Sequence, residues 1–337
     1  MNMINYGQKS LKMALLEVEN LKVWYPVRDG WFSPARHVRA VDGVSFQLES
    51  GETLGLVGES GCGKSTLGRT LVRLEDPKEG SFRIGGVEIG RLKGAGLRRA
   101  RRNFQMIFQD PYGSLNPRMT IFTALNEILQ LHTELNREER IQRVGELLKM
   151  VGLGEEVMHR YPHQFSGGQR QRIGIARALA VNPKLIIADE PVSALDVSVQ
   201  AQIINLLMDI QKNTGIAFLF IAHDLAVVEH ISRRILVMYL GKIVESGKSS
   251  DICANPAHPY TKALLSAVPV IDRETGRKRI VLPGDVPSPL APPSGCAFHP
   301  RCPLAGDICR VNTPSLEPAG DDSHLSACFF SKEVSSM

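Results

Sequence analysis

A glycine-rich turn contains the clearest chemistry in this sequence of 337 residues. It follows the apolar run Thr53–Val57, which predicts a strand, and precedes an amphipathic run that predicts a helix. Residues Gly58–Ser65 fit the spacing Gly-x-x-x-x-Gly-Lys-Ser/Thr. Glycines let backbone N–H groups turn inward around phosphate, and the helix start adds positive potential. We therefore expect Lys64 to reach the β- and γ-phosphates of a nucleotide and Ser65 to bind Mg²⁺. A glycine-rich turn with a chance lysine is the structural alternative.

Two carboxylates follow a second apolar run. Leu185–Ala188 leads directly into Asp189 and Glu190. A buried parallel strand that ends in acidic residues has this pattern, and ligands of α/β sheets bind at the carboxyl ends of strands. We expect Asp189 to lie on the Mg²⁺ side and Glu190 to take a proton from the attacking water. Taken alone, the pattern would also suit a strand that runs into an ordinary acidic turn.

A third apolar run, Ala217–Ala222, ends at His223. A single histidine after a strand is commonly a structural residue. Here the strand is expected beside the other two, so that its end faces the same phosphate. His223 is therefore our candidate for the side chain that contacts the γ-phosphate and positions the water.

A second candidate anion site opens the helical run after Phe165. Ser166 is a good helix N-cap, and Gly167 and Gly168 expose backbone N–H groups before Gln169. The first loop already surrounds one nucleotide's phosphates. A second phosphate site is best explained if it closes over a nucleotide held by another subunit, although Ser-Gly-Gly at a helix start is commonly only a cap.

Together these motifs resemble those of ABC ATPases. Gly58–Thr66 looks like the Walker A motif, Leu185–Glu190 like the Walker B motif and Ser166–Gln169 like the signature, which in this family usually begins with Leu where Phe165 stands here. The implied ATP-binding residues are Tyr25, Gly58, Glu59, Ser60, Gly61, Cys62, Gly63, Lys64, Ser65 and Thr66, with Cys62 a filler of the loop and not a nucleophile.

The resemblance also implies further roles. Gln109 matches the Q-loop glutamine, which contacts Mg²⁺ and senses the membrane subunit, and His223 matches the switch histidine. Asp196 belongs to the D-loop, which crosses the dimer interface. Tyr25, with Trp24 as competitor, would stack on adenine. The catalytic set is then Glu190, His223 and Gln109, and the Mg²⁺ set is Ser65, Gln109 and Asp189.

We expect an α/β fold with a P-loop NTPase core of the ABC type. The ATPase domain would span residues 14–250, with an antiparallel β portion at 14–50 and 81–90 and a helical subdomain at 111–180 whose groove would receive a helix of a permease. Asn136 and Glu139 predict a capping box. The apolar face of the helix that follows would consist of Ile141, Val144, Leu147, Leu148 and Val151.

Composition excludes several classes of protein. The apolar fraction is 43% and no apolar run approaches the ~20 residues that cross a bilayer. The net charge of +5 is mild and, without a basic run or interleaved aromatic residues, is weak evidence for nucleic acid, which we do not expect as a partner. The first residues contain no signal-peptide pattern, and we hypothesise that translation begins at Met13 rather than Met1, which an intact mass would decide.

Residues 251–330 are expected to form a separate, loop-rich extension, because half of the 20 prolines lie between Pro256 and Pro303. Its segments His258–Thr261, Leu264–Pro269 and Pro287–Pro289, together with Tyr161–His163 and Asp110–Pro117 earlier in the chain, resemble those of ATPases from the oligopeptide/dipeptide importer group. The resemblance is especially close to the F-type subunit of dipeptide importers. The resemblance implies two integral-membrane permease subunits, a second and paralogous ATPase subunit, an extracytoplasmic peptide-binding protein as an indirect partner, and a peripheral position on the cytoplasmic face of the inner membrane.

Four of the six cysteines fall in this extension: Cys296, Cys302, Cys309 and Cys328. Disulfides are disfavoured in a cytosolic ATPase, whereas free thiols, structural Zn²⁺ and a 4Fe–4S cluster all stay open. The spacing lacks the Cys-x-x-Cys pair of most zinc sites. The resemblance favours a 4Fe–4S cluster because members of the importer group contain one in such a tail.

The expected function is ATP hydrolysis that powers import of dipeptides or short oligopeptides, with ATP and Mg²⁺ as cofactors. An importer of nickel or another small solute is an alternative, because the cargo is selected by proteins other than this chain. A soluble ABC ATPase acting on nucleic acid or ribosomes is disfavoured, since such chains commonly contain two nucleotide domains, coiled-coil insertions or basic arms.

Overall fold

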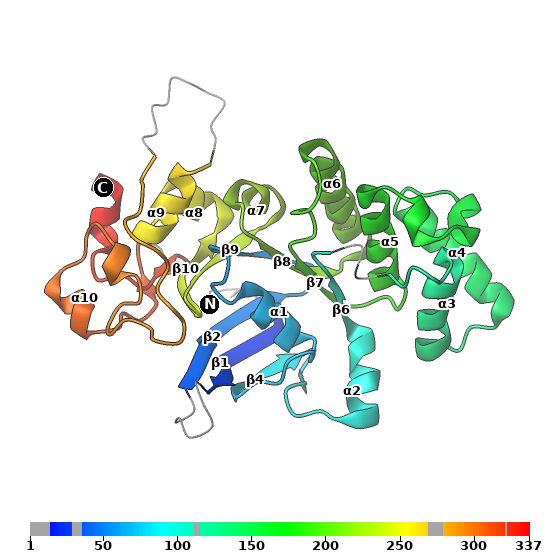
Figure 1. Ribbon diagram of the computed structural model, residues 1–337, viewed down its shortest axis with the longest axis horizontal. Coiled ribbons are helices and arrows are strands. Elements are labelled where there is room, and N and C mark those ends of the chain that lie inside the picture. The colour runs from blue at the N-terminus through cyan, green and yellow to red at the C-terminus, as the bar shows by residue number, and fades with distance from the viewer. Residues whose placement is uncertain (1–13, 29–35, 111–112, 114, 269–278, 321) are drawn as a thin grey trace, which may run out of the picture.

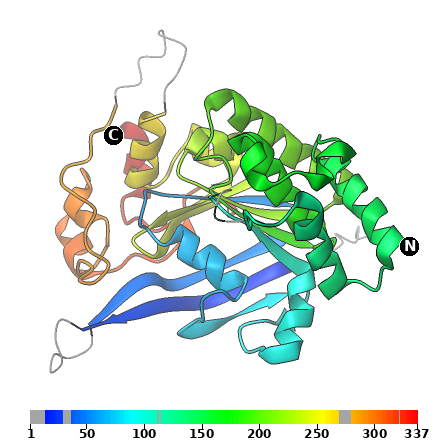
Figure 2. The same ribbon diagram turned by 45° about the vertical axis from the view of Figure 1, so that its right-hand side comes forward.

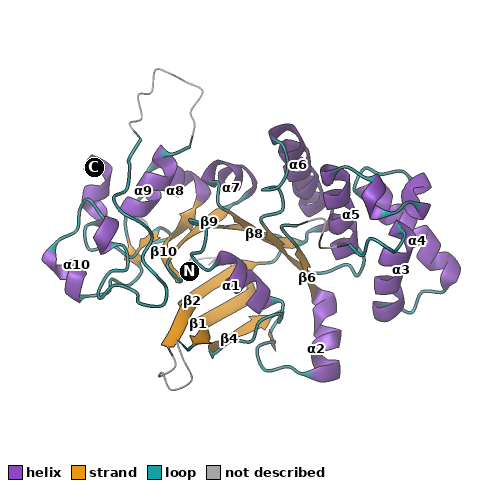
Figure 3. Cartoon of the chain, in the orientation of Figure 1, coloured by secondary structure: helices purple, strands orange, loops and turns teal. Residues whose placement is uncertain are grey.

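The computed structural model describes residues 14–28, 36–110, 113, 115–268, 279–320 and 322–337. Its strands form two sheets in the centre of the molecule, with helices around them (Figure 3). Seen from the angle of Figure 2, the blue strands of the smaller sheet lie below the larger sheet, and most of the green helices lie above it. The proposed start at Met13 falls outside the described residues.

The larger sheet has eight strands in the order β11-β12-β10-β9-β3-β8-β7-β6. The five strands from β9 to β6 pair in parallel, and β10, β12 and β11 extend the sheet with antiparallel pairings. Its strands are β3 (Thr53–Val57), β6 (Phe104–Ile107), β7 (Leu185–Asp189), β8 (Ala217–Ala222), β9 (Arg234–Tyr239), β10 (Lys242–Lys248), β11 (Glu317–Pro318) and β12 (Leu325–Ser326).

The three apolar runs of the sequence are adjacent strands of this sheet, since β3 pairs with β8 and β8 with β7. Alternate residues enter two different cores. Ile186 and Phe218 belong to the core on one face, whereas Ile187 and Leu219 belong to the core on the other. Burial on both faces explains why these strands are continuously apolar and do not alternate with polar residues.

The smaller sheet is antiparallel, with the order β2-β1-β4-β5. Its strands are β1 (Ala14–Val27), β2 (Arg36–Glu49), β4 (Glu79–Ile84) and β5 (Val87–Glu88). Helix α1 (Lys64–Leu71) contacts strands of both sheets and buries Leu67 and Leu71 between them.

Three helices gather at one end of the molecule, to the right in Figure 1: α3 (Ile121–His132), α4 (Arg137–Met150) and α5 (Gly167–Leu179). The capping box of α4 is confirmed, with Asn136 Oδ1 accepting from the Glu139 backbone N–H and Glu139 Oε2 accepting from that of Asn136. The apolar face is confirmed except at Ile141, which is 42% exposed because it lies in the first turns, beyond the core. The other helices are α2 (Gly94–Ala100), α6 (Val197–Thr214), α7 (Leu225–Ile231), α8 (Ser249–Ala254), α9 (Pro259–Ser266) and α10 (Asp307–Val311).

The C-terminal extension is joined to the core sheet, which differs from the separate unit expected from composition. Strand β12 pairs with β10 through Glu245↔Ser326 and Ser246↔Leu325. Glu245 is fully buried and accepts hydrogen bonds from the backbone N–H groups of Ala257 and His258, and its Oε1 lies 2.7 Å from His324 Nε2. None of the helices in the described residues has the length and apolarity needed to cross a membrane.

Candidate functional site

The phosphate loop lies between β3 and α1, at the carboxyl end of the sheet. Gly63 has φ 107°, in the left-handed region, and a Cβ there would lie 2.0 Å from the Ala40 carbonyl oxygen. Only glycine fits this position without strain. The side chain of Lys64 is buried and donates to the carbonyl oxygens of Gly58 (2.7 Å) and Glu59 (3.0 Å). The ammonium group therefore lies inside the curve of the loop.

Ser65 and Asp189 meet across the strand ends. Ser65 Oγ donates to Asp189 Oδ1 at 2.8 Å, and Asp189 is 2% exposed. Burial raises the pKa of the Asp189 carboxyl, and the hydrogen bond from Ser65 partly offsets this rise. A hydroxyl and a carboxylate at this spacing are a suitable oxygen donor set for Mg²⁺.

Glu190 adopts φ 45°, in the left-handed region that non-glycine residues rarely occupy. Its backbone is held by three hydrogen bonds: its own N–H donates to the Ile221 carbonyl (2.9 Å), and its carbonyl accepts from Ser193 Oγ (3.1 Å) and from the Ser193 N–H (3.3 Å). Backbone strain of this kind is concentrated at functional sites.

The Glu190 carboxylate has two partners that the sequence also singled out. Gln109 Nε2 donates to Glu190 Oε2 at 2.9 Å, and His223 Nδ1 lies 3.6 Å from the same oxygen. The His223 side chain is 57% exposed and that of Glu190 14%. An acid, an amide and an imidazole thus converge beside Ser65 and Asp189, where they are able to position and deprotonate a water molecule.

The signature residues lie at the start of α5, within the helical end of the molecule. Ser166 is the N-cap of α5: its Oγ accepts from the Gln169 N–H (3.3 Å), and Gln169 Oε1 accepts from the Ser166 N–H (3.1 Å). A Cβ at Gly168 would lie 2.4 Å from a methyl group of Val199, so α5 and α6 approach closely there. In Figure 1, α5 lies well to the right of α1, so these residues are not brought together with the chain's own phosphate loop.

Asp196 is the N-cap of α6. Its Oδ1 accepts from the Val199 N–H (3.0 Å) and from Ser198 Oγ (2.7 Å), and these hydrogen bonds lower the pKa of the carboxyl. The D-loop role of Asp196 stays a prediction.

The two candidate adenine-stacking residues have different surroundings. Burial and the nearby Glu75 raise the pKa of the Tyr25 hydroxyl, which also lies close to Thr66, so the ring lies beside the start of α1. Trp24 instead donates from Nε1 to Asp42 Oδ1 at 3.2 Å, and the Arg39 guanidinium lies over its ring at 5.0 Å. The contact with Thr66 favours Tyr25 as the residue beside a bound nucleotide.

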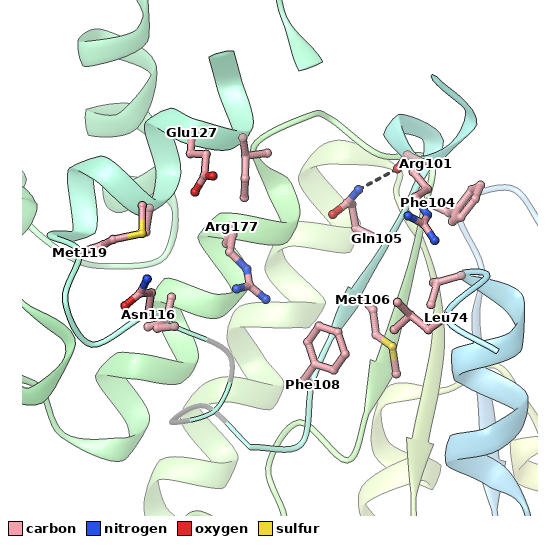
Figure 4. Close-up of a pocket in the computed structure, with 14 residues that line it drawn as sticks. Leu74, Arg101, Phe104, Gln105, Met106, Phe108, Asn116, Met119, Glu127 and Arg177 are labelled. Carbon is pink, nitrogen blue, oxygen red and sulfur yellow. Dashed lines mark hydrogen bonds between the residues drawn. The ribbon is translucent and has the colours of Figure 1, made fainter. Parts of the chain in front are cut away.

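A groove of about 530 Å³ opens between β6 and helices α3 and α5 (Figure 4). Phe108, Met106 and Leu74 line one side, and Arg177 and Glu127 point into it from the helices. Gln105, whose Nε2 donates to the Arg101 carbonyl at 2.7 Å, lies at its end. Phe108 directly precedes Gln109, so an occupant of this groove would touch the segment that contacts Glu190.

None of the four cysteines of the extension forms a disulfide. Burial and the neighbouring thiols raise the pKa of Cys302 to about 11 and that of Cys328 to about 12. Within the part of the chain that the structure describes, no group of three or more His, Cys, Asp or Glu side chains is able to hold a metal ion. The geometry therefore does not show the predicted metal centre.

Two residues that the sequence reasoning missed contact the phosphate loop from the extension. Tyr260 Oη accepts from the Glu59 N–H at 2.7 Å, and the Arg301 guanidinium contacts both Glu59 carboxylate oxygens, at 2.7 and 3.1 Å. They lie 201 and 242 residues beyond Glu59, and no local motif marks them.

Comparison with protein families finds two matches. Residues 41–193 match the ABC transporter family, and residues 244–309 match the C-terminal region of oligopeptide/dipeptide transporters. The second match includes Cys296, Cys302 and Cys309 but ends before Cys328.

Individual relatives extend these matches over nearly the whole chain. The chain is 54% identical to the oligopeptide transport ATP-binding protein AppF of Bacillus subtilis, covering 94% of this chain and 97% of that protein. It is 50% identical to the dipeptide transport ATP-binding protein DppF of Escherichia coli, with 96% of each covered. Among solved structures, a dimeric ATP-binding cassette in a post-hydrolysis state with ADP and Pi is 30% identical, with a TM-score of 0.62, covering 69% of this chain and 98% of that one.

Proposed function

This chain belongs to the ABC transporter family, and we propose that it is the ATP-hydrolysing subunit that drives a membrane importer of dipeptides or short oligopeptides. The hydrogen bond between Ser65 and Asp189 supports the ATPase chemistry most directly, because it joins the phosphate loop to the acidic strand end. The match of residues 244–309 and the names of the relatives support peptides as the cargo. An importer of nickel or another small solute is the second candidate.

The nucleotide would bind with its phosphates in Gly58–Thr66 and its adenine against Tyr25. Lys64 would contact the β- and γ-phosphates, while Ser65, with Asp189 and Gln109, would hold Mg²⁺. Metal bound there supplies charge neutralisation of the phosphates. Glu190 would accept the proton of the attacking water, and His223 would contact the γ-phosphate and hold that water in line.

Hydrolysis would require two ATPase subunits, closed head to tail. Ser166–Gln169 of each would cover the nucleotide held by the other, since the start of α5 lies away from the chain's own loop. The exposed N–H groups at this helix start suit a phosphate. Asp196 would lie at the interface. A paralogous second ATPase is favoured over a second copy of this chain, by resemblance to the importer group.

The groove lined by Phe108 and Arg177 would receive a helix of one of two integral-membrane permease subunits. Its apolar side suits the apolar face of a helix, and its lining also includes the charged residues Arg101 and Glu127. An occupant would shift the β6 end and hence the hydrogen bond from Gln109 to Glu190. The chain would thus be held peripherally at the membrane by its permeases, with a peptide-binding protein on the opposite side as an indirect partner.

A pull-down tests this assembly. Glu190→Gln, isolated from detergent-solubilised membranes with ATP and Mg²⁺, is expected to recover two permeases and a second ATPase, identified by mass spectrometry. Recovery of ribosomal proteins or nucleic acid without a membrane protein would instead indicate the soluble class of ABC ATPase.

The groove has its own matched pair of variants. Leu74 lines the groove and is 54% exposed, and Leu131 is 65% exposed on α3 but does not line it. Leu74→Glu should reduce recovery of the permeases, and Leu131→Glu should not. Equal recovery with both would exclude this groove as the docking site.

We also propose that Cys296, Cys302, Cys309 and Cys328 bind a 4Fe–4S cluster. The Cys328 sulfur accepts from the backbone N–H of Phe330 at 3.4 Å, and a donor of this kind stabilises a thiolate ligand. The cysteine sulfurs that bind a multi-iron cluster lie farther from one another than those that bind a single metal ion. The lack of a single-ion site among the described residues therefore weighs more against Zn²⁺ than against a cluster.

Metal analysis after anaerobic purification tests this second proposal. About four iron atoms per chain are expected, with loss of iron in Cys302→Ser and retention in Cys253→Ser, whose buried thiol lies outside the set. Zinc in place of iron would show that the cysteines bind Zn²⁺ instead of a cluster. Protein without either metal would show that the four cysteines are free thiols.

A further inference from the structure

The phosphate loop is held from outside by the C-terminal extension, through the single residue Glu59. Both oxygens of the Glu59 carboxylate accept from Arg301, at 2.7 and 3.1 Å. The Glu59 backbone N–H donates to Tyr260 Oη at 2.7 Å. Side chain and backbone of one loop residue are thus fixed by two residues that follow it by 242 and 201 positions.

These contacts are well supported by their surroundings. The Arg301 side chain is 8% exposed, and its fork geometry matches the carboxylate, so the pair is bidentate and largely shielded from water. Glu59 raises the pKa of Arg301, which therefore stays charged. Tyr260 is fully buried, and its ring packs with Tyr239 (centroids 4.8 Å apart) and Phe298 (5.4 Å). Neither partner is free to move independently of the core.

Glu59 is also a residue on which Lys64 depends. The Glu59 carbonyl oxygen accepts from Lys64 Nζ at 3.0 Å, beside the bond to the Gly58 carbonyl. A path of direct contacts therefore leads from Arg301 and Tyr260 through Glu59 to the ammonium group expected on the phosphates. A binding site whose charged groups are held in place before the ligand arrives binds more tightly than one that must be ordered on binding.

We propose that Arg301 and Tyr260 are positioning residues of the nucleotide site, through which the C-terminal extension sets the affinity of the phosphate loop for ATP. This proposal rests on the proposed function. The extension is then a structural part of the ATP site. The contacts of Glu59 determine nucleotide binding, and the hydrolytic step depends on Glu190 and its partners.

The test measures the Kd of a fluorescent ATP analogue on the purified full chain, and KM and kcat on the assembled transporter. Arg301→Met is expected to raise Kd and KM about tenfold, the loss of one charge-assisted contact, while kcat changes less than about threefold. Arg301→Lys keeps the positive charge but loses the bidentate contact with the carboxylate. Its Kd should lie between those of Arg301→Met and the native chain. Tyr260→Phe keeps the ring in its aromatic packing, removes only the acceptor of the Glu59 N–H, and should raise Kd in the same direction.

The control is a second arginine–glutamate pair at the other end of β3. Arg234 donates to the two oxygens of Glu52 at 2.7 and 3.0 Å, directly before the strand that leads into the loop. Arg234→Met should lower the Tm and leave the Kd for the ATP analogue unchanged. If it raises Kd as much as Arg301→Met does, the effect is general destabilisation, and the proposal is wrong.

A double-mutant cycle isolates the pair. The double variant Glu59→Gln/Arg301→Met should bind ATP no more weakly than Arg301→Met alone, because the two substitutions remove the same interaction between these side chains. Full additivity would overturn the proposal, as would native affinity in both Arg301→Met and Tyr260→Phe. If the native chain itself binds no ATP, it is the proposed function that fails.

Discussion

Gln109 donates from Nε2 to Glu190 Oε2 at 2.9 Å, across 81 residues of sequence. The same carboxylate oxygen faces His223 at 3.6 Å. Gln109 directly follows Phe108, which lines the groove, so this hydrogen bond connects the candidate docking surface to the candidate base. In a transporter, that connection would let the permease influence when water is activated.

Glu190→Gln should reduce kcat about 10³-fold, because an amide does not accept the proton of the attacking water. The substitution preserves shape and still offers an oxygen to Gln109, so ATP binding should stay near native. Phosphate release and equilibrium nucleotide binding measure the two effects separately. Near-native turnover would show that another residue is the base.

Gln109→Ala should reduce stimulation of ATPase activity by the permeases about tenfold or more, since it cuts the contact between groove and base. Comparing ATPase rates of the assembled transporter and of the isolated chain measures this coupling. Gln142→Ala is the control, because Gln142 is exposed on α4 and bonds only to Glu146 in the hydrogen bonds described. Undiminished stimulation in Gln109→Ala would disprove the link.

Asp189→Asn should raise the Mg²⁺ concentration needed for half-maximal ATPase activity about 10- to 100-fold, the usual effect of losing a group that orients a metal ligand. Asp189 accepts from Ser65 Oγ, which is the expected Mg²⁺ ligand. Titration of Mg²⁺ at saturating ATP measures the change. An unchanged Mg²⁺ requirement would exclude Asp189 from the metal site.

Acid should destabilise the fold through His258. Burial lowers the pKa of His258 to about 3, and its Nδ1 accepts from the Tyr260 N–H at 3.1 Å. The unfolded chain takes up this proton near pH 6.5 and the folded chain does not, so stability falls as pH drops from about 6.5 toward 3.

The measurement compares two chains. Between pH 7 and 5 the native chain should lose about 2 kcal/mol more of its free energy of unfolding than His258→Asn, which keeps a helix N-cap without a titrating group. Denaturant unfolding at both pH values gives the difference. Equal losses would mean that His258 is protonated in the folded state.

The sequence predicts the elements that hold the candidate site residues because each of these elements is local, while the roles of the residues stay predictions. A strand, a turn and a helix start lie within Thr53–Leu71, and the acidic pair directly follows its own strand. Parallel strands share one carboxyl edge, so the approach of Ser65 to Asp189 follows from adjacency of β3, β8 and β7.

The extension is harder to predict because its structure depends on distant partners. Proline content suggests loops, yet Pro259 occupies the first turn of α9, where its missing N–H costs nothing. Strand β12 is only two residues long and exists because β10 offers it an edge. No local sequence spacing predicts the Glu59–Arg301 pair, because its formation depends on how the last part of the chain folds back onto the phosphate loop.

The order of synthesis gives the Glu59–Arg301 pair a further consequence. Ribosomes add about 5–20 residues per second, so Arg301 leaves the ribosome about 12–48 s after Glu59, which it follows by 242 positions. Between the synthesis of His223 and that of Tyr260, the growing chain contains every nucleotide motif but lacks both supports of Glu59 and the final strands of the sheet. A nascent chain that stops before Arg301 should therefore bind nucleotide poorly, which would delay the appearance of an ATP-competent subunit until translation is nearly complete.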